Sequence, residues 1–398
     1  MEKDFDVIIY GATGFTGQLV VKYFSSINTD VNWAIAGRNK DKLEEVAEKF
    51  AKGVAILVAD SDDEKALDLI TSRTKVIIST AGPCYRHGSK LVASCVENST
   101  HYVDITGENF WVKGLIDKHH EEASAKGVRI IPSCGYDSLP SDLGTFYAVT
   151  KINQPIKRVE SFHAMKGGAS GGTIETMFSM GSLGLGPEMQ DPFLLNPENS
   201  YTEEQKSFSS DRVGLAEKKE INSWSAPFIM AMANTRVVRR SAALYAERQE
   251  PYGESFTYQE HGIHENRWAA IKSLITTIMG GIVLMTPLKY LVKPFLPKPG
   301  EGPSEEVQEN GFFDCKYIVE TEEGKKEVFR MYAKGDPGYK VTSKLVSECA
   351  LALVENKDEL PGGPEYGGVL TCASGLGKPL IGRLSKVGVL FEGPLEKN

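Results

Sequence analysis

Tyr10-Gly-Ala-Thr-Gly-Phe-Thr-Gly17 is the stretch that decides the fold of this 398-residue chain. It follows the apolar run Phe5–Tyr10, which predicts a buried parallel strand, and it precedes Gln18–Phe24, whose apolar residues have helical spacing. Its three glycines allow a tight turn, a close approach of the backbone to a pyrophosphate, and close packing of helix on strand. The helix N-terminus offers free N–H groups to phosphates. We therefore predict a dinucleotide site, although the G-x-x-G-x-x-G spacing is a variant of the commonest fingerprint.

The first 150 residues alternate apolar runs with helical patterns, which is typical of a doubly wound parallel sheet of the Rossmann type. The predicted strands are 5–10, 33–36, 54–59, 75–80, 101–105 and 128–131. Ligands of such sheets lie beyond the carboxyl ends of the strands. The cofactor contacts that we predict in the glycine turn and at these strand ends are Gly11, Thr13, Gly14, Phe15, Thr16, Gly17, Arg38, Asn39, Asp60, Thr80, Ala81, Gly82, Pro83, Asp104 and Gly135.

Arg38, at the end of the second predicted strand, indicates which cofactor is bound. Sites that prefer NAD usually place an Asp or Glu at this position, where it accepts hydrogen bonds from the ribose 2′-hydroxyl. An arginine at the same point pairs with the 2′-phosphate of NADP(H) instead. The sequence thus predicts NADP(H), and the alternative is a solvated surface arginine. Asp60, after the third strand, either bonds the adenine amino group or caps the helix that begins at 61–63.

Composition excludes several other classes of protein. The formal charge of −8 and the absence of a basic stripe argue against a nucleic-acid partner. Six scattered cysteines without a C-x-x-C pair, and no signal peptide, favour reduced thiols in a cytoplasmic protein. The histidines show no H-x-x-x-H spacing, so we expect no metal site.

Three later loops carry a family resemblance. Ser79–Gly88, Tyr102–Glu108 and Cys134–Gly144 are similar to loops of the saccharopine dehydrogenase-like oxidoreductases, and the chain most resembles the branch with the trans-acting enoyl reductases. The likeness resumes at 167–173, 299–303 and 367–371. It implies an NADP-dependent oxidoreductase. Characterised saccharopine-forming enzymes need cationic anchors for amino-acid carboxylates, and the absence of such a constellation here counts against a substrate of that kind.

The length of the chain and the resemblance together predict two domains and a closing segment. We assign residues 1–150 to an NADP-binding Rossmann domain and 151–365 to an α+β domain for substrate binding or oligomerisation. Residues 366–398 are expected to return to the Rossmann domain. Within the second domain the patterns predict a loop or lid at 194–211 and a hairpin at 311–335.

Ser273–Leu288 departs from the soluble pattern, because it is uncharged and largely apolar with lysines 272, 289, 293 and 298 beside it. A spanning helix needs about 20 apolar residues, and this run is shorter and contains Pro287. A buried helix or homodimer interface is one interpretation. A segment that docks on a membrane or lipid surface is another, and a transmembrane span is a third.

Candidates for catalysis follow the fourth and sixth strands. Tyr85 lies where the nicotinamide ribose is expected and could donate a proton or a hydrogen bond. Asp137 and Ser138 follow strand six, although Ser138 could be only a helix N-cap. Asp104 and Glu108 could touch the cofactor or only order their loop.

Tyr147-Ala-Val-Thr-Lys151 has the Y-x-x-x-K spacing of short-chain dehydrogenases, in which the lysine lowers the tyrosine pKa. Here the pair follows a sixth strand and sits where the chain leaves for the second domain, so we interpret it as accidental.

These observations predict an NADP-dependent oxidoreductase that reduces the C=C bond of an enoyl substrate, either an acyl thioester or a lipid-linked group. One alternative is reduction of an imine or ketone, as in saccharopine dehydrogenases. Another is a non-catalytic NADP-binding protein that acts on a lipid surface or binds a partner.

Overall fold

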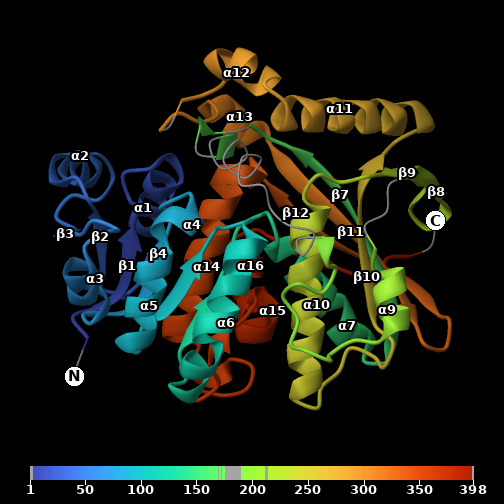
Figure 1. Cartoon of the computed structure of the whole chain (residues 1–398), viewed down its shortest axis with the longest axis horizontal. Helices are drawn as coiled ribbons and strands as arrows, with labels where there is room; N and C mark the ends of the chain where they lie inside the picture. Colours follow the sequence, from blue (N-terminus) through green and yellow to red (C-terminus); the bar gives the residue numbers. More distant parts are fainter. Residues whose placement is uncertain are drawn as a thin grey trace.

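Two seven-stranded sheets organise the chain (Figure 1). The computed structural model describes residues 3–396 except 169, 172, 175–189, 211–213 and 299, and it leaves the side chains of 284 and 285 undescribed. Three predicted segments fall partly outside the described residues: the glycine-rich stretch 167–173, the loop 194–211 and the stretch 299–303.

The first sheet is parallel, with the order β13-β6-β5-β4-β1-β2-β3. Its strands are β1 (Phe5–Tyr10), β2 (Trp33–Gly37), β3 (Ala55–Val58), β4 (Thr74–Ser79), β5 (His101–Asp104), β6 (Arg129–Ile131) and β13 (Gly368–Val369). All six strands predicted before residue 132 are present, within one residue at each end. The doubly wound Rossmann-type sheet is therefore confirmed.

Helices cover both faces of this sheet because its central strands are continuous apolar runs, so the residues that point to either side are apolar. Val7 and Ile9 enter one core, and Ile8 and Tyr10 enter the other. The helices around the sheet are α1 (Phe15–Ser26), α2 (Lys40–Phe50), α3 (Glu64–Thr71), α4 (Cys84–His87), α5 (Ser89–Glu97), α6 (Asn109–Ala125), α7 (Leu139–Ile152), α14 (Thr342–Glu355), α15 (Cys372–Gly375) and α16 (Gly377–Lys386).

The second sheet has the order β14-β12-β11-β7-β10-β9-β8, in which only β7 and β10 pair in parallel. Its strands are β7 (Ile156–Lys166), β8 (Ala216–Lys218), β9 (Ser223–Ala226), β10 (Thr257–His264), β11 (Phe312–Thr321), β12 (Lys326–Lys334) and β14 (Leu390–Glu392). The predicted hairpin is β11–β12. The helices beside this sheet are α9 (Glu203–Phe208), α10 (Ala231–Glu247), α11 (Arg267–Met285), α12 (Leu288–Val292) and α13 (Glu305–Asn310). The expectation of a loop at 194–211 is wrong for α9, which a Thr202–Gln205 capping box begins.

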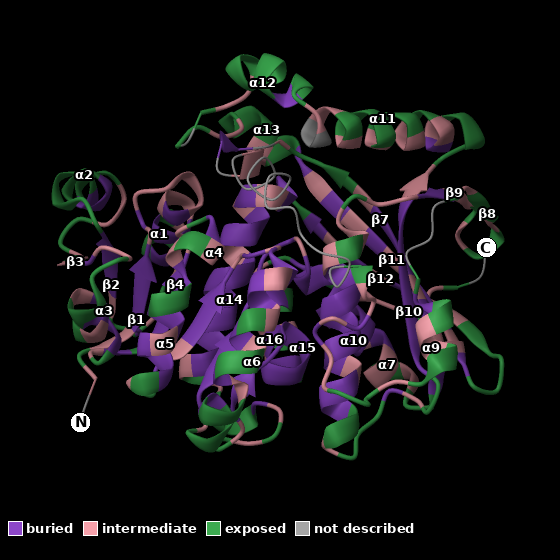
Figure 2. Cartoon of the chain, viewed as in Figure 1, coloured by how far each residue is buried: buried purple, intermediate pink, exposed green. Residues whose placement is uncertain are grey.

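Helix α7 joins the two sheets. A Cβ on its Gly144 would lie 2.1 Å from the Tyr317 hydroxyl oxygen on β11, and that hydroxyl donates to the carbonyl of Pro140 at 2.7 Å. The core of the first sheet thereby continues into the second without a break. Figure 2 shows buried residues in α14 beside the first sheet and along β11 of the second.

The last part of the chain completes both sheets. β13 pairs with β6 of the first sheet, whereas β14 pairs with β12 of the second. The guanidinium of Arg129, 1% exposed, donates to the carbonyls of Pro361 (3.0 Å), Gly363 (2.6 Å) and Gly375. Helix α14 packs against α1, β4 and β5, although the sequence assigned its residues to the second domain.

Candidate active site

The glycine turn between β1 and α1 has the geometry of a phosphate cradle. Gly11 has a φ of +83°, which glycine adopts without strain. A Cβ on Gly17 would lie 2.3 Å from the carbonyl oxygen of Gly11, so only glycine lets α1 start this close to the strand. At Gly14 a Cβ would meet only that same oxygen, at 3.4 Å. The packing thus demands glycine at 11 and 17, whereas at 14 it leaves room beside the backbone.

The first N–H groups of α1, next to this turn, have no acceptor within the helix. The Gln18 N–H donates to the carbonyl of Gly14 at 2.9 Å, so the N–H groups of Phe15, Thr16 and Gly17 precede the first bonded turn. The Gln18 side chain fixes the turn by donating to the carbonyl of Thr13 at 3.1 Å. Thr80, after β4, closes it from the other side through hydrogen bonds to the carbonyls of Tyr10 and Gly11, both at 3.1 Å. These features fit a bound pyrophosphate.

Arg38 lies exposed at the end of β2, and the structure gives it no hydrogen bond or ion pair within the described chain. Its neighbour Asn39 caps α2 by accepting from the Lys42 N–H at 3.0 Å. The pKa of Tyr10 is raised to about 12, chiefly by burial; Asp60 raises it further and Arg38 lowers it, so both charges lie near that phenol. The strand ends thus present a cation without a partner where a 2′-phosphate is expected.

The helix-capping alternative for Asp60 is wrong. Helix α3 is capped by Asp63, whose carboxylate accepts from the Ala66 N–H at 3.1 Å. The Asp60 carboxylate accepts from the Asp62 N–H, at 3.0 Å, before the helix begins. A contact between Asp60 and adenine stays a prediction.

Asp104 and Glu108 order the loops after β4 and β5. Asp104 is fully buried and accepts hydrogen bonds from the Thr106 and Ser133 N–H groups and the Tyr102 hydroxyl, each at 2.9 Å. Glu108 accepts from the N–H groups of Cys84 (3.1 Å) and Tyr85 (2.7 Å). Burial raises the pKa of Asp104 to about 6 and that of Glu108 to about 7. These bonds favour the loop-ordering alternative for both residues.

The turn after β4 carries Ala81, Gly82 and Pro83 into the short helix α4, where Tyr85 lies. A Cβ on Gly82 would meet nothing within 4 Å, so this backbone borders open space. The Tyr85 ring packs on Phe110 at 5.6 Å, and its hydroxyl accepts from the Arg86 Nε at 2.8 Å. Tyr85 is thus half-buried beside the predicted cofactor turn, with its own hydroxyl hydrogen free to be donated.

Asp137 lies between the loops that follow β5 and β6. A Cβ on Gly107 would be 3.5 Å from its Oδ2, and no other residue comes within 4 Å of that point. Within the described chain the Asp137 carboxyl has no hydrogen-bond or ion-pair partner, and burial raises its pKa to about 6. Gly135 is buried two residues earlier, and its carbonyl accepts from the Leu139 N–H at 3.0 Å. Asp137 is therefore a carboxyl without a partner at the carboxyl ends of the strands.

Ser138 precedes α7, but its side chain does not cap the helix, so that alternative is wrong. Its hydroxyl donates to the Asn234 Oδ1 at 3.0 Å, and the Asn234 amide donates to Glu260 at 2.6 Å. Glu260 also accepts from the Tyr258 hydroxyl at 2.8 Å. This buried chain ties the loop after β6 to β10 of the second sheet. Asn234 and Glu260 lie about 100 residues further on, so no local pattern signals them.

Three helices begin around this loop. Asn109, the first residue of α6, donates to the carbonyl of Ala233 in the first turn of α10 at 3.0 Å, while Ser138 holds the start of α7 to Asn234. The positive ends of three helix dipoles thus converge, an arrangement that stabilises negative charge. Ile229 and Met232, at the start of α10, expose 59% and 53% of their surface. The site therefore combines an electropositive backbone with an apolar rim.

The second domain touches the cofactor turn directly, which the sequence did not predict. The Phe15 ring meets Tyr339 edge-on at 5.3 Å, and a Cβ on Gly302 would lie 2.4 Å from it. The Tyr339 hydroxyl bonds the Thr173 hydroxyl at 2.6 Å, and the Gly171 N–H donates to the carbonyl of Glu301 at 3.1 Å. The stretches 167–173 and 299–303, which resemble family motifs, thus meet over Phe15 in their described parts.

The Tyr147/Lys151 pair faces away from these loops. The Tyr147 hydroxyl donates to the carbonyl of Phe391 at 3.3 Å, and its ring packs on Phe329 and Phe391 of the second sheet. The Lys151 ammonium lies over the Tyr147 ring, 5.6 Å from its centre, rather than beside the hydroxyl. The structure gives the pair a packing role.

We expect Tyr147→Phe to leave kcat and KM within about twofold of wild type, because the variant keeps the ring and loses one weak hydrogen bond. A general acid or base typically contributes 10²–10⁴-fold. Steady-state assays of NADPH oxidation check this, and a loss of that size would overturn the assignment of the site to the strand-end loops.

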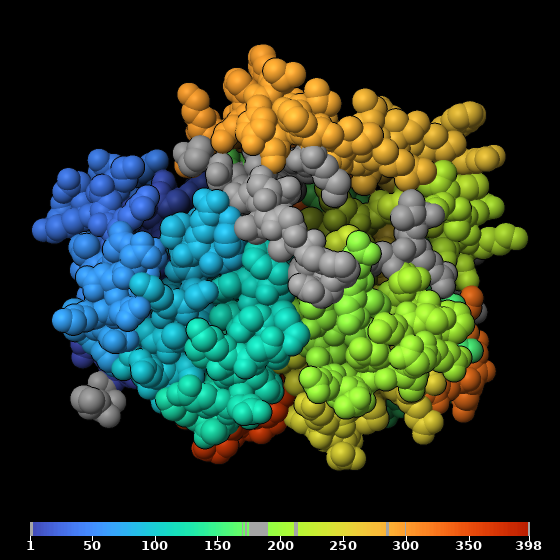
Figure 3. Space-filling view, in the orientation of Figure 1, coloured from blue at the N-terminus to red at the C-terminus, as the bar shows by residue number. Residues whose placement is uncertain are grey.

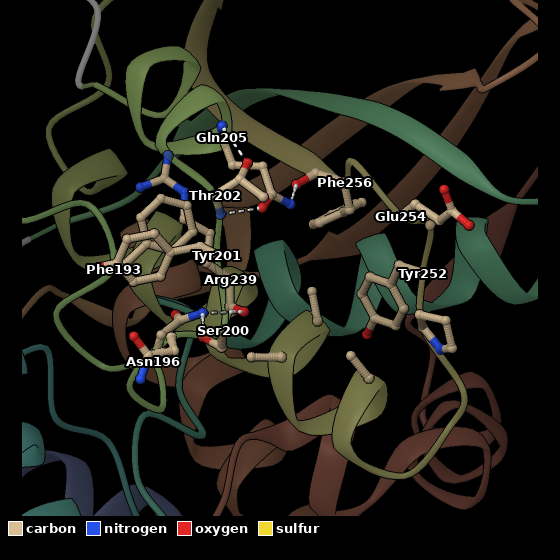
Figure 4. Close-up of a pocket in the computed structure, with 16 residues that line it drawn as sticks. Phe193, Asn196, Ser200, Tyr201, Thr202, Gln205, Arg239, Tyr252, Glu254 and Phe256 are labelled. Atoms are coloured by element: carbon tan, nitrogen blue, oxygen red, sulfur yellow. Dashed lines mark hydrogen bonds between the residues drawn. The ribbon is translucent and has the colours of Figure 1, made fainter.

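A separate cavity of about 290 Å³ lies beside the C-terminal half of α10 (Figure 4). Alanines 242, 243 and 246 form part of its wall, and Phe193 stacks on Tyr201 at 4.1 Å along one side. None of the predicted site residues lines it. We therefore do not assign it to catalysis.

Three cysteines meet beneath the loop after β6. The sulfur atoms of Cys134, Cys349 and Cys372 lie within 4.8 Å of one another, and burial helps to raise the pKa of each thiol. All three belong to the continuous apolar core, so Cys134 packs there as a small core residue.

The chain is similar to known proteins over most of its length. A family profile described as the saccharopine dehydrogenase NADP binding domain matches residues 7–131. A Mycobacterium tuberculosis protein with a provisional trans-acting enoyl reductase name is 34% identical over 98% of this chain and 97% of its own length. The chain belongs to the saccharopine dehydrogenase-like oxidoreductases, in the trans-acting enoyl reductase branch.

Two further comparisons support the family and the fold. The trans-acting enoyl reductase of Mycobacterium ulcerans is 32% identical over 98% of this chain and 97% of its own. Apo saccharopine dehydrogenase (L-Glu forming) from Saccharomyces cerevisiae superposes with a TM-score of 0.53 at 14% identity, covering 98% of this chain and 99% of its own, and so shares the fold.

This saccharopine dehydrogenase-like protein is thus an NADP(H)-binding oxidoreductase. The N–H groups before Gln18 would hold the pyrophosphate, and Arg38 would hold the 2′-phosphate.

Three arginines of α10, each at most 3% exposed, bind backbone carbonyls: Arg236 that of Gln190, Arg239 those of Pro192 and Tyr258, and Arg240 those of Leu195 and Val369. These buried cations are engaged in holding the fold.

Proposed function

We propose that this oxidoreductase reduces the C=C bond of an α,β-unsaturated acyl thioester. The observation that carries the proposal is similarity over nearly the whole chain to proteins named trans-acting enoyl reductases. The site supports it, because an apolar rim suits an acyl chain and converging helix N-termini suit an anionic intermediate.

When bound, NADPH supplies a hydride for the β-carbon of the substrate. The charge that develops on the thioester oxygen needs hydrogen-bond donors placed in advance. The Tyr85 hydroxyl and the backbone N–H of Gly135 are the candidates for this role. The first turns of α6, α7 and α10 add a favourable field.

Asp137 is the candidate that protonates the α-carbon. A carboxyl whose pKa is raised to about 6 keeps a protonated fraction near neutral pH. It has no partner in the described chain to compete for its proton, and it lies beside Gly107, where the neighbouring backbone leaves space. Proton transfer to carbon leaves a carboxylate, which solvent reprotonates for the next turnover.

Reduction of an imine or ketone remains the second candidate, because the fold is shared with a saccharopine dehydrogenase. The side chains of Arg236, Arg239 and Arg240 are buried against backbone carbonyls, which argues against their binding the carboxylates of an amino-acid substrate.

The expected partners are therefore an acyl substrate and a lipid or protein surface from which the acyl substrate is delivered. Contact with a lipid surface, or a homodimer, is the corresponding proposal for the apolar stretch 273–288.

The test follows NADPH absorbance with enoyl thioesters of increasing chain length, alongside ketones, imines and saccharopine. We expect oxidation only with the enoyl set and a kcat/KM that rises with chain length, since each buried CH₂ contributes about 0.8 kcal/mol. Tyr85→Phe should lower kcat more than it alters NADPH affinity, because it removes a donor from the reacting end.

Two outcomes would contradict this proposal. Turnover confined to imines or ketones would replace the enoyl substrate while leaving the cofactor site intact. Tight NADPH binding without oxidation by any substrate would favour the non-catalytic alternative. Binding of NADPH, measured by fluorescence, serves as the control that the protein is folded.

A further inference from the structure

Helices α11 and α12 form an arm, residues 267–298, along one edge of the molecule (Figures 1 and 3). One side of α11 packs on β9 and β10, where Ala270 is fully buried. Apart from Lys289, which is buried, most of the remaining arm faces outward, and Figure 2 shows mostly exposed and intermediate residues along it. The buried-helix interpretation of this stretch is therefore wrong.

The outward side of the arm is apolar. On α11, residues spaced by seven, four and three positions share one face, and they are strongly exposed: Trp268 79%, Ile275 52%, Met279 61% and Ile282 51%. The surface continues over Tyr290 (66%), Leu291 (69%) and Phe295 (87%). Single exposed apolar residues are ordinary, but a contiguous group of this kind marks an interaction surface.

The charge of the arm identifies what covers this surface. Residues 267–298 contain one arginine and four lysines and no Asp or Glu, in a chain whose formal charge is −8. Anionic headgroups attract such a segment, and aromatic side chains prefer the interface. Because the formal charge of the arm is positive, a second copy docked on the same surface would instead bring like charges together. None of the described helices is by itself long and apolar enough to cross a membrane. The helical segments 267–283 and 288–295 meet these criteria only when taken together, and a bend of 99° separates them.

We infer that the arm docks on a lipid surface that carries anionic headgroups. The apolar face of α11 and the side chains of Leu291 and Phe295 enter the acyl boundary, while Lys272 and Lys298 lie among the headgroups. The arm continues into Gly302, which packs on Phe15 of the cofactor turn. Docking thus holds the cofactor turn close to the lipid, and it does not depend on the proposed reaction.

Sedimentation with vesicles of phosphatidylcholine and phosphatidylserine, at roughly a 7:3 ratio, tests this inference. We expect Leu291→Ser with Phe295→Ser to weaken binding by at least about 100-fold, since burial of each side chain is worth about tenfold or more. Lys272→Glu with Lys298→Glu should weaken it by about 25-fold or more, since each lysine near the surface contributes about fivefold. Vesicles of phosphatidylcholine alone should bind the wild type far more weakly.

Matched controls lie on distant surfaces. Val58→Ser with Leu69→Ser removes side chains of similar exposure, 49% and 58%, and Lys65→Glu with Lys118→Glu changes charge equally; neither pair should alter binding. Equal binding of wild type and the Leu291/Phe295 variant would overturn the inference. So would a dimer in lipid-free buffer, seen by light scattering, that the same variant dissociates, because a second copy would then be the occupant. The charge-reversal pair leaves the apolar surface intact and keeps the test valid if the serine variant fails to fold.

Discussion

Replacing Asp137 by Asn is expected to lower kcat by about 10²–10⁴-fold, the usual contribution of a general acid. Asparagine keeps the size of the side chain but has no proton to give. In the wild type the protonated carboxyl is the active form, so kcat should fall as pH rises above about 6, the pKa that burial gives this group. The Asn variant should lack this alkaline limb, which a pH profile of kcat under saturating NADPH measures.

The substitution Asp137→Asn should lower activity without lowering the stability of the fold at neutral pH. The pKa of Asp137 is higher in the folded chain, about 6, than the ordinary 3.8, so the folded state favours its protonated form. That contribution is present below about pH 3.8 and is lost as pH rises through about 6. At pH 7.5, Asp137→Asn should therefore melt at the same temperature as wild type or higher. A lower Tm would mean that the carboxylate supports the fold instead.

Two further variants separate the candidates for the acid. Asp62→Asn, on an exposed turn, should leave the profile unchanged. Glu108→Gln addresses the other carboxyl near the site, whose pKa burial raises to about 7. If the alkaline limb persisted in Asp137→Asn and vanished in Glu108→Gln, Glu108 would be the acid and the present assignment would fall.

Replacing Arg38 by Ala is expected to weaken NADPH binding by roughly ten- to a hundredfold and to leave NADH binding nearly unchanged. A lost charge-assisted bond to the 2′-phosphate is worth about 1.5–3 kcal/mol. Because Arg38 is exposed and bonds nothing in the described chain, its removal should not affect the fold. Fluorescence titration with both cofactors measures the difference, and Lys42→Ala, one turn into α2, is the matched control. Equal losses for the two cofactors would contradict the assignment.

Local patterns predicted the first sheet well because each of its strands is a short apolar run that ends in a turn. The glycine turn was equally clear, since packing alone requires glycine at 11 and 17. The hairpin β11–β12 followed from its polar turn. In each case the residues that determine the structure are neighbours in the chain.

The rest of the site depends on contacts between distant residues. Ser138 looked like a helix cap, but its hydroxyl donates to Asn234, some 96 positions away. Phe15 is covered by Gly302 and Tyr339, which no spacing in the first domain could reveal. The apolar stretch within α11 had the composition of a core helix, and only its position on the edge of the molecule showed that it is exposed.

The pairing of β13 with β6 has a consequence for how this protein is made. Until residue 369 has left the ribosome, the edge of β6 carries unpaired N–H and C=O groups, and the Arg129 guanidinium lacks the carbonyls of Pro361, Gly363 and Gly375. Open strand edges are templates for aggregation, and a buried cation without acceptors is costly. The edge of β6 is therefore open to such pairing until nearly the whole chain has been synthesised. A premature stop codon late in the gene, even one that spares every cofactor contact, should yield a product that quality control degrades.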